Sequence, residues 1–257
     1  MNKENNSNNY TMQSVQKAIK VLNAFSKEEP QLSLTELHKK TGIAISSLQR
    51  FVTTLVCEGF LHKDERTKQY QLGLSLLFLG RLVEEESSLL TVTKPILRKL
   101  NETTGESVSL NVIDGKERRC ILNFESTFTL STKTYVGDSS PLYAGASSKS
   151  LLAFLPKDEL EHYIDEIDLI PITENTIITK EHLRESLMEI RHQGYAISNS
   201  ERVKGAFSVS APIRLADGRP VASITIVIPV VRIDDYDQTE LIESVLTATK
   251  AIEAQLY

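Results

Sequence analysis

The stretch from Thr41 to Leu61 constrains the fold more than any other part of this sequence. At the helical period its apolar residues fall on one side, namely Leu48, Val52, Leu55, Val56 and Gly59, with Phe51 beside them. The other side carries hydroxyls, one amide and one guanidinium. A break at Thr41-Gly42 precedes this helix, and Gly59 follows it as a terminating residue. The pattern is typical of the second helix of a helix-turn-helix motif, and also of an ordinary surface helix.

The segments on either side favour the helix-turn-helix interpretation and predict a winged domain over residues 13–73. Ser14 is a candidate N-cap for a first helix whose apolar face comprises Val15, Ala18, Ile19, Leu22 and Phe25. Ser33 and Glu36 have capping-box spacing and begin a short second helix, about Leu34 to Lys40. After Gly59, two extended runs flank a charged tip, which indicates a β-hairpin wing; a solvated loop is the alternative.

The distribution of charge supports contact between this domain and nucleic acid. The chain carries −5 overall, but the residues up to Gly80 contain ten basic and seven acidic side chains, hence +3, which leaves −8 for the remainder. We expect groove contacts from Ser46, Ser47, Gln49, Arg50 and Thr53, and phosphate contacts from Lys17, Lys63, Arg66 and Lys68. The polar residues 1–12 are predicted to form a disordered tail.

Composition excludes several classes of protein. Apolar residues make up 40% of the 257 residues and charged residues 25%, as in an ordinary soluble globular protein. No apolar run reaches the roughly 18 residues of a membrane span, and the polar N-terminus has no apolar signal core. The only cysteines, Cys57 and Cys120, have no metal-ligand or disulfide-scaffold spacing. We therefore expect a cytoplasmic protein without a metal or another cofactor.

The remaining sequence predicts a linker helix over residues 74–90 and an α+β domain over residues 91–257. The linker is rich in leucine and needs a partner surface, either in its own chain or in a neighbour. Ser107–Val112 alternates as a half-buried strand does, and Asp114-Gly115 is a hairpin turn signal. Further strands are expected at Cys120–Phe124, Leu130–Val136, Tyr195–Ser198, Ser208–Ile213 and Val221–Ile228, and helices at Ala146–Leu155, Lys157–Glu166, Lys180–Gln193 and Asp237–Leu256.

Motifs spread over nearly the whole chain carry a resemblance to one family. They are Leu32-Ser33-Leu34-Thr35-Glu36-Leu37, Thr41-Gly42-Ile43, Ser46-Ser47-Leu48-Gln49-Arg50, Glu58-Gly59-Phe60-Leu61, Thr104-Gly105-Glu106-Ser107, Lys149-Ser150-Leu151-Leu152-Ala153 and Gly194-Tyr195-Ala196. In these motifs the sequence resembles the IclR family of bacterial transcription regulators, from about residue 13 onward. The resemblance implies a winged helix-turn-helix head, a linker helix with the heads paired as dimers, and an effector domain similar to the GAF fold, an antiparallel sheet flanked by helices.

One departure from the family pattern concerns the start of the reading helix. The family commonly has Pro-Lys-Ser-Thr there, whereas this chain has Ala44-Ile45-Ser46-Ser47. Loss of the lysine removes a phosphate or guanine contact, and Ile45 offers an apolar surface to a thymine methyl group. We expect a different operator preference from that of relatives with the lysine, and Arg50 is left as the only cation of the reading helix.

No catalytic site is predicted. The segment around Lys149 lacks the glycines of a phosphate-binding loop, because Ser148 precedes the lysine and Tyr143 stands at the first glycine position. The five histidines are scattered along the chain, so a catalytic triad has no support. We expect that the protein is not an enzyme.

A ligand pocket is expected instead. The helix that starts near Ala146 offers backbone amides and a positive dipole end to a carboxylate. The family resemblance implies an effector held between this helix start and two later strands, with matching positions at Ala146, Ser147, Ser198 and Ser208. Some relatives have an acidic residue at the third position and a cysteine at the fourth. Leu142 and Tyr143 are expected to form an apolar wall, and the alternative for Ser208 is the polar face of a strand.

These patterns predict a sequence-specific DNA-binding transcription regulator controlled by a small carboxylate effector. Its expected partners are a double-stranded DNA operator, the small organic acid and further copies of the chain, as a homodimer or a dimer of dimers, without a membrane. The alternative is a small-molecule sensor or enzyme whose helical head binds protein rather than DNA. Only the first interpretation predicts salt-dependent retention on duplex DNA.

Overall fold

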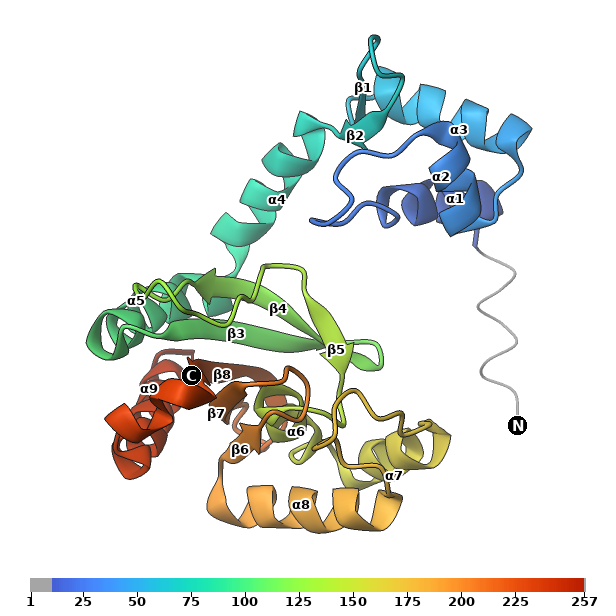
Figure 1. Ribbon diagram of the computed structural model, residues 1–257. Helices are drawn as coiled ribbons and strands as arrows, with labels where there is room; N and C mark the ends of the chain where they lie inside the picture. The colour runs from blue at the N-terminus through green and yellow to red at the C-terminus, as the bar shows by residue number, and fades with distance from the viewer. Residues whose placement is uncertain (1–10, 257) are drawn as a thin grey trace. The chain divides into compact units, whose positions relative to one another are not determined.

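The computed structural model describes residues 11–256, which form two compact units divided between Glu86 and Ser87 (Figure 1). Of the predicted disordered tail, all but Thr11 and Met12 lies outside the described residues. Between residues 11 and 256, none of the helices is both long and apolar enough to cross a membrane. The two units are described in turn.

The first unit is a three-helix head with a two-stranded wing and one further helix. Its elements are α1 (Gln13–Leu22), α2 (Leu34–Thr41), α3 (Ile45–Cys57), β1 (Leu61–Lys63), β2 (Tyr70–Leu72) and α4 (Leu74–Glu86). Val21, Leu37, Leu48 and Val52 are fully buried and join the three helices in one apolar core. The winged helix-turn-helix that the sequence predicts is confirmed.

Helix α1 differs from its prediction at both ends. It begins at Gln13, with Met12 in the N-cap position and no side-chain cap, so Ser14 lies inside the helix. The helix gains this extra residue because Gln16 N–H donates to the carbonyl of Met12 over 3.1 Å. It ends at Leu22, short of Phe25. The N-cap assignment to Ser14 is therefore wrong.

The turn between α2 and α3 forms as predicted. The Ser33 Oγ accepts the Glu36 N–H over 3.3 Å, and the Glu36 carboxylate accepts the Ser33 N–H over 2.7 Å, which completes the capping box. Gly42 ends α2 with φ at 67°, a left-handed conformation that favours glycine. The capping box and this glycine fix where α2 begins and ends.

Two glycines connect the wing and α4 to the end of α3. The backbone of Gly73 approaches so closely that a Cβ built there would lie 2.1 Å from the Gly59 carbonyl oxygen. Gly73 N–H donates to the Phe60 carbonyl over 2.8 Å, and the Ser75 N–H donates to the Gly59 carbonyl over 3.3 Å. The start of α4 is therefore fixed to the C-terminal end of α3.

The helix expected over residues 74–90 ends earlier, at Glu86. The Ser87 Oγ accepts the Leu90 N–H over 3.3 Å and so caps a separate helix, α5 (Ser88–Thr104). No residue of α4 is buried in the described chain, although leucines dominate its sequence.

The second unit is an antiparallel sheet with helices on both faces. Besides α5, it contains β3 (Ser107–Asp114), β4 (Glu117–Phe124), β5 (Ser139–Pro141), α6 (Ala146–Leu152), α7 (Lys157–Glu166), α8 (Lys180–Gln193), β6 (Ala196–Asn199), β7 (Ala206–Arg214), β8 (Pro220–Pro229), the 3-10 helix η1 (Val230–Asp235) and α9 (Gln238–Leu256). The strand order in the described part is β5-β4-β3-β8-β7-β6, with every pair antiparallel. The α+β fold class is thereby confirmed.

The two faces of this sheet have different chemistry. One face presents aliphatic side chains such as Val108, Val209 and Ile226, which pack against α5 and α9. The other face is covered by α6, with α7 and α8 next to it (Figure 1). Strand register aligns polar side chains across this second face, so that Ser109, Thr225 and Ser210 are neighbours on three adjacent strands.

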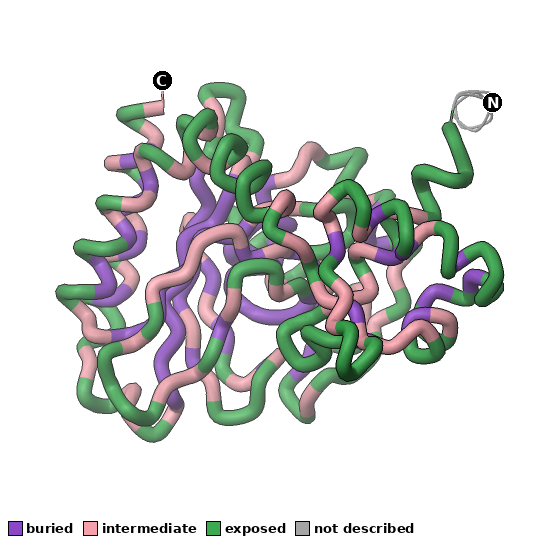
Figure 2. The backbone as a smooth tube through the Cα atoms, turned by 90° about the horizontal axis from the view of Figure 1, so that it is seen from above, coloured by how far each residue is buried: buried purple, intermediate pink, exposed green. Residues whose placement is uncertain are grey.

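Burial of this polar face contradicts the prediction that β3 is half-buried. Ser109 and Asn111 are buried like Leu110 between them, and the central strands are buried along most of their length (Figure 2). Internal hydrogen bonds replace water, because the Asn111 amide donates to Ser109 Oγ and to Thr225 Oγ1 over 3.2 Å each. An alternating pattern therefore marks a strand with two buried faces here.

The strand expected at Leu130–Val136 is absent from the described sheet. The free edge of β4 pairs with β5 instead, with Arg118 opposite Ser140. Cys120 exchanges backbone hydrogen bonds with Gly137 and Asp138, beyond the predicted strand. Residues 130–136 run as a loop, and β5 pairs with Glu117–Arg119 of β4.

Candidate functional sites

The polar face of α3 is open to solvent. Ser46, Ser47, Gln49, Arg50 and Thr53 are all exposed, as a surface that reads DNA requires. The Gln49 amide donates weakly to Thr53 Oγ1 over 3.4 Å. Ala44 provides no side-chain cap, so it leaves the first-turn amides of α3 unblocked. The Arg50 side chain has no acidic partner among the described residues.

The cations around this face differ in their partners. Lys63 and Lys68 pair with the same carboxylate, Glu65, over 3.4 and 2.8 Å. Arg66 at the tip and Lys17 on α1 are exposed and form no ion pair within residues 11–256. Exposed ion pairs contribute little, so all four cations can reach a phosphate at small cost.

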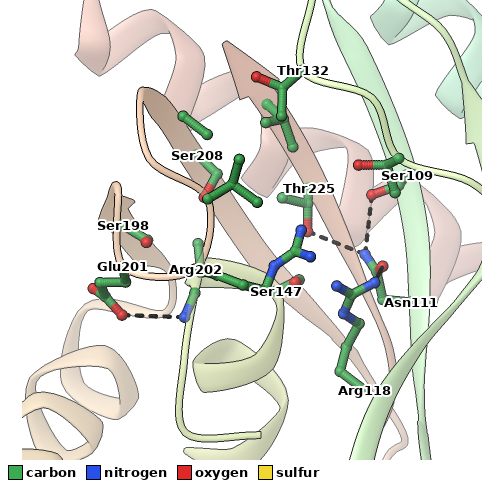
Figure 3. Close-up of a pocket in the computed structure, with 16 residues that line it drawn as sticks. Ser109, Asn111, Arg118, Thr132, Ser147, Ser198, Glu201, Arg202, Ser208 and Thr225 are labelled. Atoms are coloured by element: carbon green, nitrogen blue, oxygen red, sulfur yellow. Dashed lines mark hydrogen bonds between the residues drawn. The ribbon is translucent and has the colours of Figure 1, made fainter. Parts of the chain in front are cut away.

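A small cavity lies in the second unit between α6 and the polar face of the sheet (Figure 3). Its volume is about 30 Å³, which is room for roughly two water molecules. The polar lining comes from all the surrounding elements and comprises Ser109, Asn111, Arg118, Thr132, Thr134, Ser147, Ser198, Glu201, Arg202, Ser208 and Thr225. Hydroxyl, amide and guanidinium groups therefore dominate the site.

The structure brings four of the predicted effector residues together and separates two. Ala146, Ser147, Ser198 and Ser208 line the cavity. Leu142 and Tyr143 do not, because both are buried in the apolar core among α6, α7 and α8. The Tyr143 hydroxyl donates to the Ile170 carbonyl over 3.0 Å. Leu142 and Tyr143 therefore form no apolar wall of this cavity, in contrast to the sequence-based expectation.

An internal ion pair lies at the start of α6. The Glu201 carboxylate accepts the Gly145 N–H over 3.1 Å and a hydrogen bond from the Lys149 ammonium over 2.7 Å. Lys149 is buried, and this carboxylate compensates its charge. The sequence predicts that amides at the start of this helix bind a ligand. One of them, the Gly145 N–H, already has Glu201 as its acceptor.

Arg118 on β4 is the most strongly constrained cation of the cavity. Its side chain is 1% exposed, and it donates from Nε to Ser140 Oγ and from Nη1 to Asn111 Oδ1, each over 3.1 Å. Its Nη2 has no hydrogen-bond partner among residues 11–256, and neither does the buried Thr134 Oγ1. Burial, and then the positive charge of Arg202, lower the pKa of Arg118 to about 10, so it stays charged at neutral pH.

Arg202 approaches the same cavity from the loop between β6 and β7. Its side chain lies across Gly145, where an added Cβ would be 3.7 Å from the Arg202 Cβ and 3.8 Å from Nε. Its guanidinium points into the cavity (Figure 3) and forms no hydrogen bond or ion pair with any described residue. Burial lowers the pKa of this group from its ordinary value.

Sequence reasoning missed both arginines. Arg118 stands in the run Lys116-Glu117-Arg118-Arg119, which has the composition of an exposed hairpin tip. Only the register of β4 against β5 turns it inward, opposite Ser140. No local pattern marks Arg202 either. Its role depends on a loop that folds back over the start of α6.

A winged helix-turn-helix unit followed by a separate α+β unit is an organisation that fits a DNA-binding transcription regulator. Comparison with known proteins agrees. Residues 14–65 match the IclR helix-turn-helix domain, and residues 83–254 match the family described as bacterial transcriptional regulator IclR C-terminal. The chain belongs to the IclR family of bacterial transcription regulators.

Individual relatives span nearly the same length. The HTH-type transcriptional regulator KipR of Bacillus subtilis is 36% identical over 212 residues, which cover 82% of this chain and 84% of KipR. The IclR of Thermotoga maritima is 29% identical, with a TM-score of 0.73 over 96% of this chain and 99% of its own. An IclR homolog from Microbacterium hydrocarbonoxydans, complexed with 4-hydroxybenzoate, shares the fold at 20% identity, with a TM-score of 0.83 over 95% of this chain and 98% of its own.

Proposed function

We propose that this chain is a sequence-specific DNA-binding regulator whose operator binding is controlled by a small organic acid in the cavity beneath α6. The observation that carries the effector proposal is the Arg118 Nη2, a charged donor that is buried without a partner. An unsatisfied buried donor costs about 1–3 kcal/mol, and a carboxylate oxygen would recover that energy. The Thr134 hydroxyl is a second unsatisfied donor of the same lining.

The remaining lining fits a carboxylate ligand. Ser147, Ser198 and Ser208 supply hydroxyls around the cavity, as the sequence predicts. Glu201 is the one carboxylate of the lining, and Lys149 compensates it. The homolog complexed with 4-hydroxybenzoate supports an organic acid as the class of effector. That molecule exceeds the present volume of about 30 Å³, so a ligand of its size requires the Arg202 side chain to withdraw.

On the DNA side, the exposed face of α3 would enter the major groove. Ser46, Ser47, Gln49 and Arg50 would reach base edges, with Thr53 one turn further on. Lys17 and the wing cations would contact phosphates and fix the register. One short helix reads only a few base pairs, so two heads are needed for a specific operator.

Helix α4 provides the surface for pairing two heads. Its exposed apolar side chains have no partner surface in the described chain and are Leu74, Leu77, Phe78, Leu79, Leu82 and Val83. A contiguous exposed apolar patch of this kind marks an interface. We propose that α4 pairs with its copy in a homodimer, from which a dimer of dimers can assemble, and that the regulator acts in the cytoplasm.

The test measures binding to the DNA upstream of the gene by fluorescence anisotropy at two salt concentrations, with and without a panel of small carboxylates. We expect affinity to fall steeply with added salt, because phosphate contacts release counterions. We also expect at least one acid to change operator affinity. A head that binds protein instead would give no salt-dependent retention on duplex DNA, and that result would reject the proposal.

A further inference from the structure

We infer that the effector is a dianion, a short-chain dicarboxylate, because two arginines, Arg118 and Arg202, present unpaired guanidinium groups to one cavity. This inference rests on the proposed function and makes it narrower. A monocarboxylate satisfies one guanidinium and leaves the charge of the other, which for Arg202 is half-buried, uncompensated. A dicarboxylate satisfies both.

The charges around the cavity support a ligand with two negative charges. Of the groups that line it, Arg118 and Arg202 are positive, and Glu201 is negative but pairs with Lys149. The Cys120 thiol next to Arg118 is neutral at physiological pH, because burial raises its pKa to about 11. The lining is therefore left with two positive charges.

The Asp138 carboxylate attracts both guanidinium groups and acts to raise the pKa of each, but it does not pair with either of them in the described chain. Its Oδ2 accepts the Tyr135 N–H over 2.7 Å, and it forms no ion pair with Arg118 or Arg202 in the described chain. Only its backbone carbonyl accepts a hydrogen bond from Arg118 Nη1, over 3.3 Å. An anionic ligand can therefore bind both guanidinium groups without displacing an internal acid.

The two arginines are held in different ways. Arg118 lies on a strand, and Ser140, Asn111 and the Asp138 carbonyl fix its side chain, so its Nη2 is a preorganised anchor. Arg202 lies on a loop and packs against Gly145 without a polar partner among the residues described. Because the cavity is small, the Arg202 side chain has to move when a ligand enters, and it can then close on the second carboxylate.

The experiment compares succinate with succinamate, which has nearly the same size and one negative charge fewer. Isothermal titration with the full-length protein should give about tenfold or more tighter binding for succinate. Arg202→Gln removes the second guanidinium, so it should bring the two affinities close together and retain succinamate binding. Lys204→Gln is the matched control, since it removes a charge from the same loop outside the lining and should keep the preference.

The outcomes separate this inference from the proposed function. If succinamate binds as tightly as succinate, or if Arg202→Gln leaves the preference unchanged, the dianion inference is wrong while carboxylate sensing stands. Inorganic phosphate provides another arm, because equal binding of phosphate and succinate would overturn the requirement for two separated carboxylates. If no acid in the panel binds or changes operator affinity, both the inference and the proposed effector site fail.

Discussion

The burial of helices α4 and α6 is the reverse of what their compositions predict. Helix α4 has five leucines among its 13 residues, yet Phe78 is 64% exposed and no residue of the helix is buried. Helix α6 contains three serines and a lysine, yet all its residues are buried, with Lys149 only 3% exposed. Burial here follows from the partners within reach of each helix.

The same contrast extends to the two units. The head presents its unpartnered groups outward, the apolar stripe of α4 and the guanidinium of Arg50. The second unit presents its unpartnered donors inward, Arg118 Nη2 and Thr134 Oγ1. A macromolecular partner needs an open surface, whereas a small ligand needs an enclosed one. Four experiments test this contrast, in order of decreasing expected effect.

The largest effect is expected inside the second unit. Lys149→Met leaves the Glu201 carboxylate without its compensating charge and should lower the free energy of unfolding by about 3–5 kcal/mol. Urea denaturation measures this loss. The double substitution Lys149→Met with Glu201→Met should regain most of it, since neither charge is then unpaired. Lys116→Met, which breaks the exposed pair with Glu166, should cost less than about 1 kcal/mol. Equal losses in the free energy of unfolding for the two lysine substitutions would contradict the contrast between buried and exposed partners.

The next effect concerns the exposed stripe. Phe78→Glu with Leu82→Glu should separate the dimer and weaken operator binding by roughly 100-fold, because the two heads no longer bind together. Folding of the single chain should change by less than about 0.5 kcal/mol, since both side chains are exposed when the chain is not paired. Sedimentation velocity and anisotropy report the two quantities. Glu85→Gln on the same helix is the control and should preserve the dimer. A variant that stays dimeric would show that α4 is not the interface.

A smaller loss is expected at the reading face. Arg50→Ala should weaken specific operator binding by about 1–3 kcal/mol and relax the preference at one base position. Arg66→Ala at the wing tip should instead weaken binding to all sequences alike and reduce the salt slope by about one. Binding titrations on cognate and scrambled duplexes distinguish the two. Unchanged specificity in Arg50→Ala would remove α3 from the recognition surface.

The smallest effect concerns a polar contact that the head satisfies internally. Ser33→Ala removes the acceptor for the Glu36 N–H and should lower stability by about 1 kcal/mol. Thermal unfolding measures the change, and Ser33→Thr should retain most of the cap because it keeps the oxygen. Identical melting of Ser33→Ala and the parent would mean that the cap contributes nothing.

The sequence predicts those elements whose ends depend on local chemistry. Helix α8 begins and ends as expected, because the Thr179 Oγ1 accepts the His182 N–H and Gly194 ends the helix in a left-handed conformation. Helix α7 also spans Lys157–Glu166 as predicted, with Pro156 in the N-cap position and no side-chain cap. The capping box of α2 is a third case.

The remaining features depend on partners distant in sequence. The alternation in β3 does not reveal that α6 covers its polar face and that Thr225, over a hundred residues later, bonds Asn111. The extended pattern of Leu130–Val136 does not reveal that β5 takes the sheet edge. Arg118 turns inward through that same pairing. The cavity residues on α6, β6 and β7 were identified by family resemblance, and the two arginines had no such guide.

The close approach of Gly73 to Gly59 has a mechanical consequence. The two backbones are so close that a side chain at position 73 would collide with the chain after α3. This contact and its hydrogen bonds hold α3, the wing and α4 together as one rigid body. If α4 pairs with its copy as we propose, the angle at which the two α4 helices cross sets the separation of the two reading helices. A rotation of α4 would then be passed to α3 through the Gly59–Gly73 contact and would change the angle at which each head meets the groove.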